Sequence, residues 1–364
     1  MSKESKTMER EAQVKARAKE PWTARRVGDL ILNNALIIIM VIAVIYIAVV
    51  NKNFMKPASI INILAQTCAY LPVALGVGGC IVLTGTDLSA GRIVGLTACI
   101  SASLLQSVDA ASKMWVNLTP PNVILVLILA MVIGGAIGAF NGFFVAKFKL
   151  HPFIVTLGTQ LILYSCQLIA YTVLLLYVKA GNNNGMAISG LDKSYSNFIT
   201  GSLLKIGGTP IPNYVWIAVI CTIVMWFIWN KTTFGKNMFA LGANEEAARV
   251  SGVNVFATTL MVFALAGAMY AVTGFIEGAR VASNTANTGL NYESDAIAAC
   301  VIGGVSFVGG IGKIRGVIIG VVLLRIIFVG LTFMSVSSNL QYIIKGLIIL
   351  VACAIDMRKY LVRK

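Results

Sequence analysis

Charged residues are scarce in this chain. Asp, Glu, Lys and Arg make up 12% of its 364 residues, against roughly 25% in soluble globular domains. Hydrophobic residues reach 58%, and they form continuous runs near the ~20 residues that cross a bilayer as a helix. The runs lack the alternation of apolar and polar residues that is typical of a transmembrane β-barrel. The sequence therefore predicts an all-α polytopic membrane protein without an appended soluble domain.

Metal ligands and nucleotide-binding motifs are also missing. His151 is the one histidine, and it precedes Pro152 at the start of an apolar run, where we expect it to cap. The seven cysteines stand singly in apolar segments, as small buried hydrophobic residues do. No G-x-x-x-x-G-K-[ST] sequence occurs, which excludes a P-loop. We expect no metal, no cofactor and no enzymatic activity in this chain.

The net charge of +15 could suggest a nucleic-acid partner, but the distribution of Lys and Arg along the chain argues against one. We predict about ten membrane spans, some of them short or broken by glycine, so that eight or nine spans also fit. They lie at about 30–50, 59–83, 88–106, 123–146, 152–178, 213–230, 255–276, 294–309, 313–334 and 339–357.

With the N-terminus inside, 20 of the 29 basic residues fall in cytoplasmic intervals and seven in outer ones. This inside-positive bias explains the charge and predicts that both termini are cytoplasmic. The predicted organisation is a polar tail 1–28, a transmembrane domain 29–357 with a cytoplasmic loop 231–254, and a C-terminus 358–364. The tail is either solvated or forms a charged helix on anionic lipid.

The cytoplasmic loop contains the signals of a short helix. Asn244 suits the N-cap, Glu245 and Glu246 fall in the first turn where the helix dipole favours anions, and Gly252 suits the C′ position. These signals predict a helix of about seven residues, too short to cross a membrane. It is either a docking element for a partner or a loop helix without one. The outer interval 179–212 is rich in Gly, Asn and Ser, and we expect an irregular loop there with a short helix near 194–198.

Polar residues interrupt the apolar pattern at two glycine-rich places, 83–92 and 303–316. Asp87 lies in the first, where it either caps a helix that starts near Leu88 or lines a pathway. The charges at 277, 280, 293 and 295 bracket the outer interval after the seventh span, and either pair with each other or meet an outside partner. Arg325 and Lys345 lie within apolar runs, and we expect them to face the bundle or reach an interface.

Four segments resemble, in family order, the permease subunits of bacterial ABC importers for monosaccharides, the ribose/galactose/xylose group. Within that group, GTDLSAGR at 85–92 and AARVSGVNV at 247–255 look most like the galactose/methyl-galactoside permeases. Ribose-type members carry Ile and Val where this chain has Thr86 and Ala90. The four segments are GTDLSAGRIVGL (85–96), FNGFFVAKFKLHPFIVTLGT (140–159), NKTTFGKNMFALGANEEAARVSGVNV (230–255) and LNYESDAIAACVIGGVSFVGGIG (290–312).

The resemblance implies a pore subunit in the bacterial cytoplasmic (inner) membrane that works with three partners. These are a cytoplasmic ABC ATPase, an extracytoplasmic sugar-binding protein and a second copy of the chain. The loop presented to the ATPase would comprise Gly242, Asn244, Glu245, Glu246, Ala247, Ala248, Arg249 and Gly252. We expect the translocation path at Thr86, Asp87, Ser89, Gly91 and Ser306, and contacts with the binding protein at Glu277, Arg280 and Glu293.

Two other functions compete with this interpretation. A secondary sugar transporter driven by an ion gradient would need intramembrane acids at ion sites and no ATPase partner. A membrane scaffold or sensor would need neither. The capped helix in the cytoplasmic loop favours the ATP-driven importer, because neither alternative requires that helix.

Overall fold

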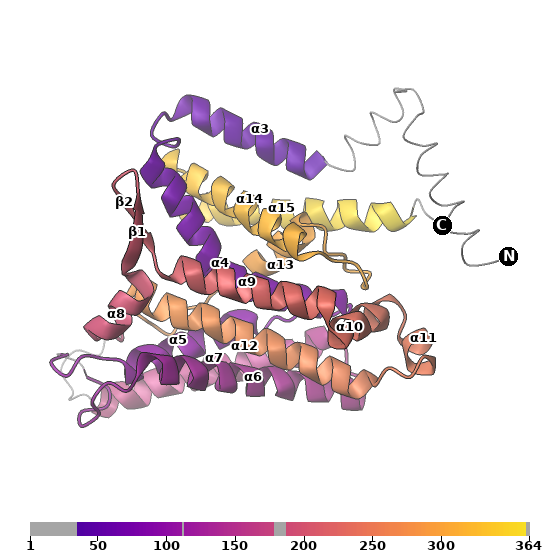
Figure 1. Ribbon diagram of the computed structural model, residues 1–364, viewed down its shortest axis with the longest axis horizontal. Helices are drawn as coiled ribbons and strands as arrows, with labels where there is room; N and C mark the ends of the chain where they lie inside the picture. Colours follow the sequence, from indigo (N-terminus) through magenta and orange to yellow (C-terminus); the bar gives the residue numbers. More distant parts are fainter. Residues whose placement is uncertain (1–34, 111–112, 178–186, 362–364) are drawn as a thin grey trace.

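The computed structural model describes residues 35–110, 113–177 and 187–361, so the predicted tail 1–28 and residues 362–364 lie outside it (Figure 1). Within these ranges the chain is mostly helical, and six helices are long and apolar enough to cross a membrane. A polytopic helical architecture is therefore confirmed. The six are α4 (Pro57–Val82), α6 (Val123–Phe148), α7 (Pro152–Tyr177), α9 (Tyr214–Lys231), α12 (Val255–Val281) and α14 (Ile314–Phe333).

The other four predicted spans also coincide with helices, which are shorter or more polar: α3 (Ala35–Val50), α5 (Ala90–Leu104), α13 (Tyr292–Ile302) and α15 (Ser338–Leu361). The predicted count of ten membrane crossings stays a prediction. The largest boundary error is at α13, which ends at Ile302 and not at 309. Gly304 adopts a φ of +81°, which ends the helix, and the chain reaches α14 through turns. The predicted C-terminal segment 358–364 begins inside α15.

The outer interval contains the short helix that was predicted and a β-hairpin that was not. The predicted short helix is α8 (Lys193–Thr200), capped by Asp192, and the Ser194 hydroxyl holds the pKa of Asp192 below its usual range. Strands β1 (Ser202–Ile206) and β2 (Thr209–Pro212) follow and pair antiparallel. Their two-residue turn is Gly207-Gly208, and both glycines have positive φ as hairpin turns require. The all-α prediction is therefore wrong for this hairpin.

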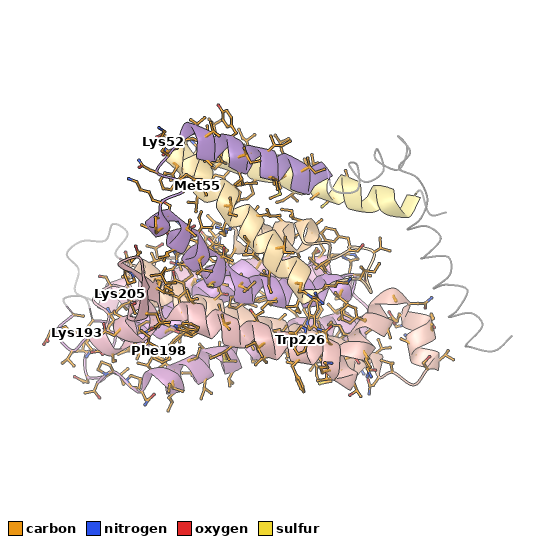
Figure 2. The ribbon with its side chains drawn as sticks, turned by 45° about the horizontal axis from the view of Figure 1, so that its top comes forward. Lys52, Met55, Lys193, Phe198, Lys205 and Trp226 are labelled. Carbon is orange, nitrogen blue, oxygen red and sulfur yellow. The ribbon has the colours of Figure 1, made fainter. Side chains whose placement is uncertain are left out.

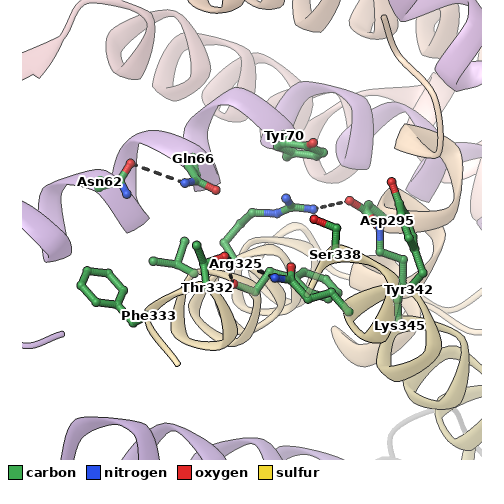
Figure 3. A pocket seen from close by; sticks show the side chains of 13 residues that line it. Asn62, Gln66, Tyr70, Asp295, Arg325, Thr332, Phe333, Ser338, Tyr342 and Lys345 are labelled. Atoms are coloured by element: carbon green, nitrogen blue, oxygen red, sulfur yellow. Dashed lines mark hydrogen bonds and ion pairs between the residues drawn. The ribbon is translucent and has the colours of Figure 1, made fainter. Parts of the chain in front are cut away.

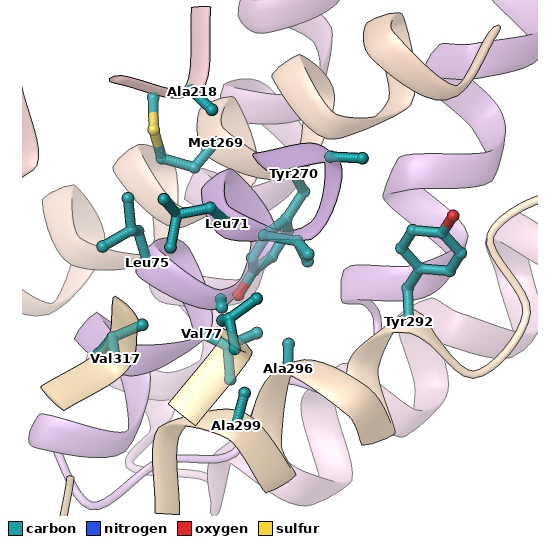
Figure 4. Close-up of a cluster of buried hydrophobic side chains, with 14 of the residues drawn as sticks. Leu71, Leu75, Val77, Ala218, Met269, Tyr270, Tyr292, Ala296, Ala299 and Val317 are labelled. Atoms are coloured by element: carbon teal, nitrogen blue, oxygen red, sulfur yellow. The ribbon is translucent and has the colours of Figure 1, made fainter. Parts of the chain in front are cut away.

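Helices α4 and α12 form the centre of the bundle. In an apolar stretch of 18 residues in each helix, 67% of the residues of α4 and 56% of those of α12 are buried, against 28% for α6 and 22% for α7. Figure 4 shows Leu71 and Leu75 of α4 around Tyr270 of α12, whose side chain is fully buried. The peripheral helices expose long apolar side chains, the surface that lipid covers.

Pro72 lies inside α4 and has no backbone N–H to donate. A proline disturbs the helical hydrogen bonds beside it, and in hydrocarbon the groups it releases need other partners. The backbone N–H of Val73 donates instead to the hydroxyl of Thr273 on α12, at 2.9 Å. The two central helices are thus joined by a hydrogen bond next to the proline.

Small residues bring α6 and α12 together. Gly134 and Gly138 of α6 face the backbone of Phe263 and Gly267 on α12 so closely that a side chain on either would overlap a carbonyl oxygen. Four-residue spacing of glycines is the usual way for membrane helices to approach each other, because dispersion contacts replace the missing hydrophobic effect.

The remaining elements lie at two opposite ends of the bundle (Figure 1). Helix α8, the β1–β2 hairpin and the α3–α4 turn lie at one end, which we call the hairpin end. Helices α10 (Thr233–Ala243) and α11 (Glu245–Val250) lie at the other, together with the start of α3 and the end of α15. Figure 2 shows Lys52, Lys193 and Lys205 at the hairpin end, and Trp226 on the flank of α9.

We predict that Gly138→Ala destabilises the bundle by about 1–3 kcal/mol, because the methyl group would overlap the Phe263 carbonyl and force α6 from α12. Thermal unfolding of the detergent-solubilised chain measures this. Gly158→Ala on α7 is the matched control, since a Cβ there meets nothing within 4 Å. Equal unfolding temperatures for the two variants would contradict the proposed close packing.

Candidate functional site

Helix α11 has the ends that its sequence predicts. The Asn244 side chain accepts a hydrogen bond from the backbone N–H of Ala247 at 2.9 Å, which makes Asn244 the N-cap. At the other end Gly252 has a φ of +84°, and its N–H and that of Val253 donate to the carbonyls of Arg249 and Ala248. These two bonds form a Schellman motif. Local hydrogen bonds therefore define both ends of the helix.

Most of the α11 surface is open to a partner. Arg249 pairs with Glu245 at 2.6 Å and with Glu246 at 3.4 Å, and the side chain of Glu246 is 76% exposed. Ala247 is exposed, whereas Ala248 is buried against the protein. A contact on α11 would therefore meet a small residue flanked by one basic and two acidic side chains.

Helix α10 connects α11 to the membrane domain through Gly242. A side chain at Gly242 would overlap the carbonyl oxygen of Val82, the last residue of α4, and would approach the Gly310 nitrogen to 2.8 Å. The N–H of Gly310 itself donates to the same Val82 carbonyl at 2.9 Å. The ends of α10 and α4 and the 303–313 turns thus share one backbone contact.

Asp87 lies in the break between α4 and α5 and is fully buried. Its Oδ1 atom accepts hydrogen bonds from the backbone N–H of Ser89 at 2.9 Å and from the Ser89 hydroxyl at 2.6 Å. Further hydrogen bonds extend this network to two other helices. The Asn141 amide of α6 donates to the Ser89 hydroxyl at 2.9 Å, and the Thr159 hydroxyl of α7 donates to the Asn141 side-chain oxygen at 2.6 Å. Helix α5 begins at Ala90 with Ser89 as its N-cap residue, close to the predicted start near Leu88, and Asp87 stabilises the turn that leads into it.

The other predicted path residues lie around the same two breaks. The Thr86 carbonyl accepts a hydrogen bond from the Thr156 hydroxyl at 3.2 Å. Gly91 leaves room for the carboxylate of Glu293, which a side chain at position 91 would overlap. Ser306 is buried in the turns after α13, and its hydroxyl accepts from the Val308 N–H at 3.3 Å. The shared contact of Val82 and Gly310 brings the two breaks together.

The residues predicted to meet a binding protein differ in exposure. Glu277 and Arg280, one turn apart on α12, form two parallel N–H···O bonds of 2.8 Å each. The Glu277 side chain is 2% exposed and that of Arg280 is 29% exposed. Glu293 is buried as well. Arg280 alone of the three thus carries a charge that reaches the surface.

One charged cluster was not predicted. Asp295 of α13 contacts Arg325 of α14 at 2.5 Å and Lys345 of α15 at 2.5 Å (Figure 3). The Arg325 guanidinium lies 3.5 Å from the ring centre of Tyr70 on α4, and Tyr70 stacks on Tyr292. The sequence showed a lone cation in each of two apolar runs, which indicated that each faces the bundle or reaches an interface. It contained no signal that both meet the same carboxylate.

Arg92 is one of the 20 basic residues that the sequence placed in cytoplasmic intervals, but it is not a solvent-exposed charge. It is buried on α5, donates to the Ala286 carbonyl at 3.3 Å, and lies over the Tyr164 ring. Without Arg92 the predicted distribution is still 19 basic residues in cytoplasmic intervals against seven in outer ones.

His151 caps the chain before α7 as expected, since its Nδ1 accepts a hydrogen bond from the Phe153 N–H at 3.3 Å. Across the described ranges, no three or more His, Cys, Asp or Glu residues converge to hold a metal.

Comparison with known proteins identifies a family. The family model described as "Branched-chain amino acid transport system / permease component" matches residues 59–353. The galactose/methyl galactoside import permease protein of Escherichia coli is 43% identical over 90% of this chain and 95% of its own. The corresponding protein of Haemophilus influenzae is 40% identical over 92% and 97%. The ribose import permease protein of the same organism is 33% identical over 91% and 95%. No solved structure matches.

We predict that Asp295→Asn destabilises the chain by about 3–5 kcal/mol, because it leaves the buried Arg325 and the partly buried Lys345 without a counter-charge. Chemical or thermal unfolding in detergent measures the change. The matched control is Glu245→Gln, which removes one partner of an exposed ion pair and should cost less than about 1 kcal/mol. An equal loss in both variants would show that the buried cluster contributes nothing special to stability.

Proposed function

Because the chain belongs to the family of permease components matched above, we propose that it is the transmembrane subunit of an ATP-driven importer for a monosaccharide in the bacterial cytoplasmic membrane. As a permease component it is not itself an enzyme. Galactose or a methyl galactoside is the proposed substrate, supported by 43% identity over 90% of the chain to a permease of that name. The family assignment favours this function over the ion-driven transporter.

The observation that carries the proposal is the position of α11. It is a capped and exposed helix at the end of the bundle opposite the hairpin, and it is joined to α10 through Asn244 and to α12 through residues 251–254. We assign this end to the cytoplasm, where the excess of Lys and Arg predicts it. A separate ATPase subunit would dock on Glu245, Glu246, Ala247 and Arg249. Asn244 and Gly252 would hold the helix in shape for that contact.

Coupling would pass through Gly242. A displacement of α11 by the ATPase moves α10, whose Gly242 lies on the Val82 carbonyl and beside Gly310. The two breaks that these residues border would form the translocation path, with Thr86, Asp87, Ser89, Gly91 and Ser306 along it. Closely packed elements shift between discrete arrangements, so a small movement at α10 can change both breaks together.

The hairpin end would receive the sugar-binding protein. Its exposed basic groups include Lys193 of α8, Lys205 of the hairpin and the partly exposed Arg280. Glu277 would act by orienting Arg280, and Glu293 by supporting the start of α5 beside Gly91. A second copy of the chain would complete the pore.

The proposed function is tested by ATP-dependent uptake. Proteoliposomes that contain the chain with its ATPase should accumulate labelled galactose when the binding protein and ATP are supplied. An ion gradient without ATP should give no uptake. Uptake that follows the ion gradient and ignores ATP would establish the secondary transporter instead.

We predict that Glu246→Lys abolishes co-purification of the ATPase, because it reverses the most exposed charge of the α11 ion pairs. Mass spectrometry of the proteins captured with the detergent-solubilised chain measures this. Lys205→Glu is the control, because it reverses a charge from positive to negative at the hairpin end, away from α11. Retention of the ATPase by Glu246→Lys would remove α11 from the contact.

We predict that Gly242→Val keeps the ATPase bound but lowers galactose uptake per ATP hydrolysed, because the side chain forces α10 away from Val82. Uptake and ATPase rates in the same proteoliposomes give this ratio. Gly346→Val on α15 is the control, since a Cβ there meets nothing within 4 Å. An unchanged ratio for Gly242→Val would place coupling elsewhere.

A further inference from the structure

A polar pocket of about 320 Å³ lies between α4, α14 and α15, and Asp295 in the first turn of α13 also lines it (Figure 3). It lies toward the hairpin end, since its lining residue Phe333 contacts Phe54 of the α3–α4 turn. The volume is at the lower limit of small-ligand sites. Polar and ionisable side chains among apolar spans are costly, so such a pocket indicates a ligand or a pathway.

The charged side chains that line the pocket contact one another. Asp295 is shared by Arg325 and Lys345, and the ring of Tyr70 covers the guanidinium. The guanidinium is not fully satisfied, because the buried Nε of Arg325 has no hydrogen-bond partner in the described part of the chain. The cluster places a guanidinium, a carboxylate and the more exposed Lys345 ammonium in the pocket lining.

The walls add side-chain amides from two different helices. Gln66 of α4 reaches Asn62 only at 3.5 Å, a weak bond. Gln341 of α15 donates to the Val336 carbonyl at 3.0 Å, which leaves its amide oxygen available. Phe328 and Tyr342 flank the Lys345 ammonium at 5.1 and 5.2 Å from their ring centres. Amides, ions and aromatic faces thus surround one small space.

We propose that this pocket binds a neutral monosaccharide on its way through the permease. A sugar hydroxyl both donates and accepts hydrogen bonds, so a sugar can pair with the Gln66 and Gln341 amides and with the Lys345 ammonium together. An anionic ligand fits less well, because Arg325 already pairs with Asp295 and would be drawn from it. This inference rests on the proposed function and adds the residues that would contact the sugar.

The first test is galactose uptake by proteoliposomes that hold the complete transporter. Gln66→Leu and Gln341→Leu should each lower the uptake rate about two- to tenfold, the value of one hydrogen bond. The unfolding temperature and the amount of bound ATPase should not change. Gln160→Leu on α7, the same substitution outside the pocket, should transport like the unmodified chain. Uptake by both pocket variants equal to that of Gln160→Leu would overturn the pocket proposal.

Failure of the proposed function would look different, because the unmodified chain itself would then not accumulate galactose.

A second test does not depend on uptake. In a Cys166→Ser background, Ser338→Cys places a thiol in the pocket lining, and Asn339→Cys places one outside it. Galactose should slow labelling of Ser338→Cys by a hydrophilic maleimide and leave Asn339→Cys unaffected. Protection by inorganic phosphate in place of galactose, or by neither, would overturn the sugar site.

Discussion

The hydrogen bond from the Gly310 N–H to the Val82 carbonyl is the contact on which the arrangement of the broken helices depends. Two apolar segments are interrupted, after α4 and after α13, and in hydrocarbon each interruption releases backbone groups that need partners. Here one interruption supplies the partner of the other. Gly242 then closes over the same carbonyl, because it has no side chain to hold α10 away. The position of α10 is therefore set by the backbone of the membrane domain.

Buried charges obey the same requirement for partners. Glu277 and Arg280 satisfy it within one turn of α12, so their pairing needs no tertiary structure. Asp295 instead draws on α14 and α15, and its charge fixes three helices relative to one another. Replacing such a cluster by apolar residues can be neutral for stability in other proteins. A role in specifying geometry or binding a ligand therefore explains its presence better than stability does.

The sequence could predict what is decided locally. The N-cap at Asn244, the Schellman turn at Gly252 and the helices under the apolar runs each depend on a few neighbouring residues. The hairpin 202–212 was missed because Gly207-Gly208 lies in a loop rich in glycine, where a turn signal does not stand out. The shared use of Asp295 could not be predicted, since Arg325 and Lys345 are separated from it by 30 and 50 positions. The burial of Arg92 depends in the same way on Ala286, far along the chain.

Helix α4 is the element that touches both regions of functional interest. Gln66 and Tyr70 in the first half of α4 line the pocket, and Val82, the last residue of α4, contacts Gly242 and Gly310. Gln66 and Val82 are sixteen positions apart, about 24 Å along a helix. Pro72 lies between them, where a helix bends most easily, and the bond from Val73 to Thr273 anchors that point to α12. A movement of Val82 would thus reach the pocket by tilting α4 about its anchor, which links the α10 contact to the pocket without a chain of loops.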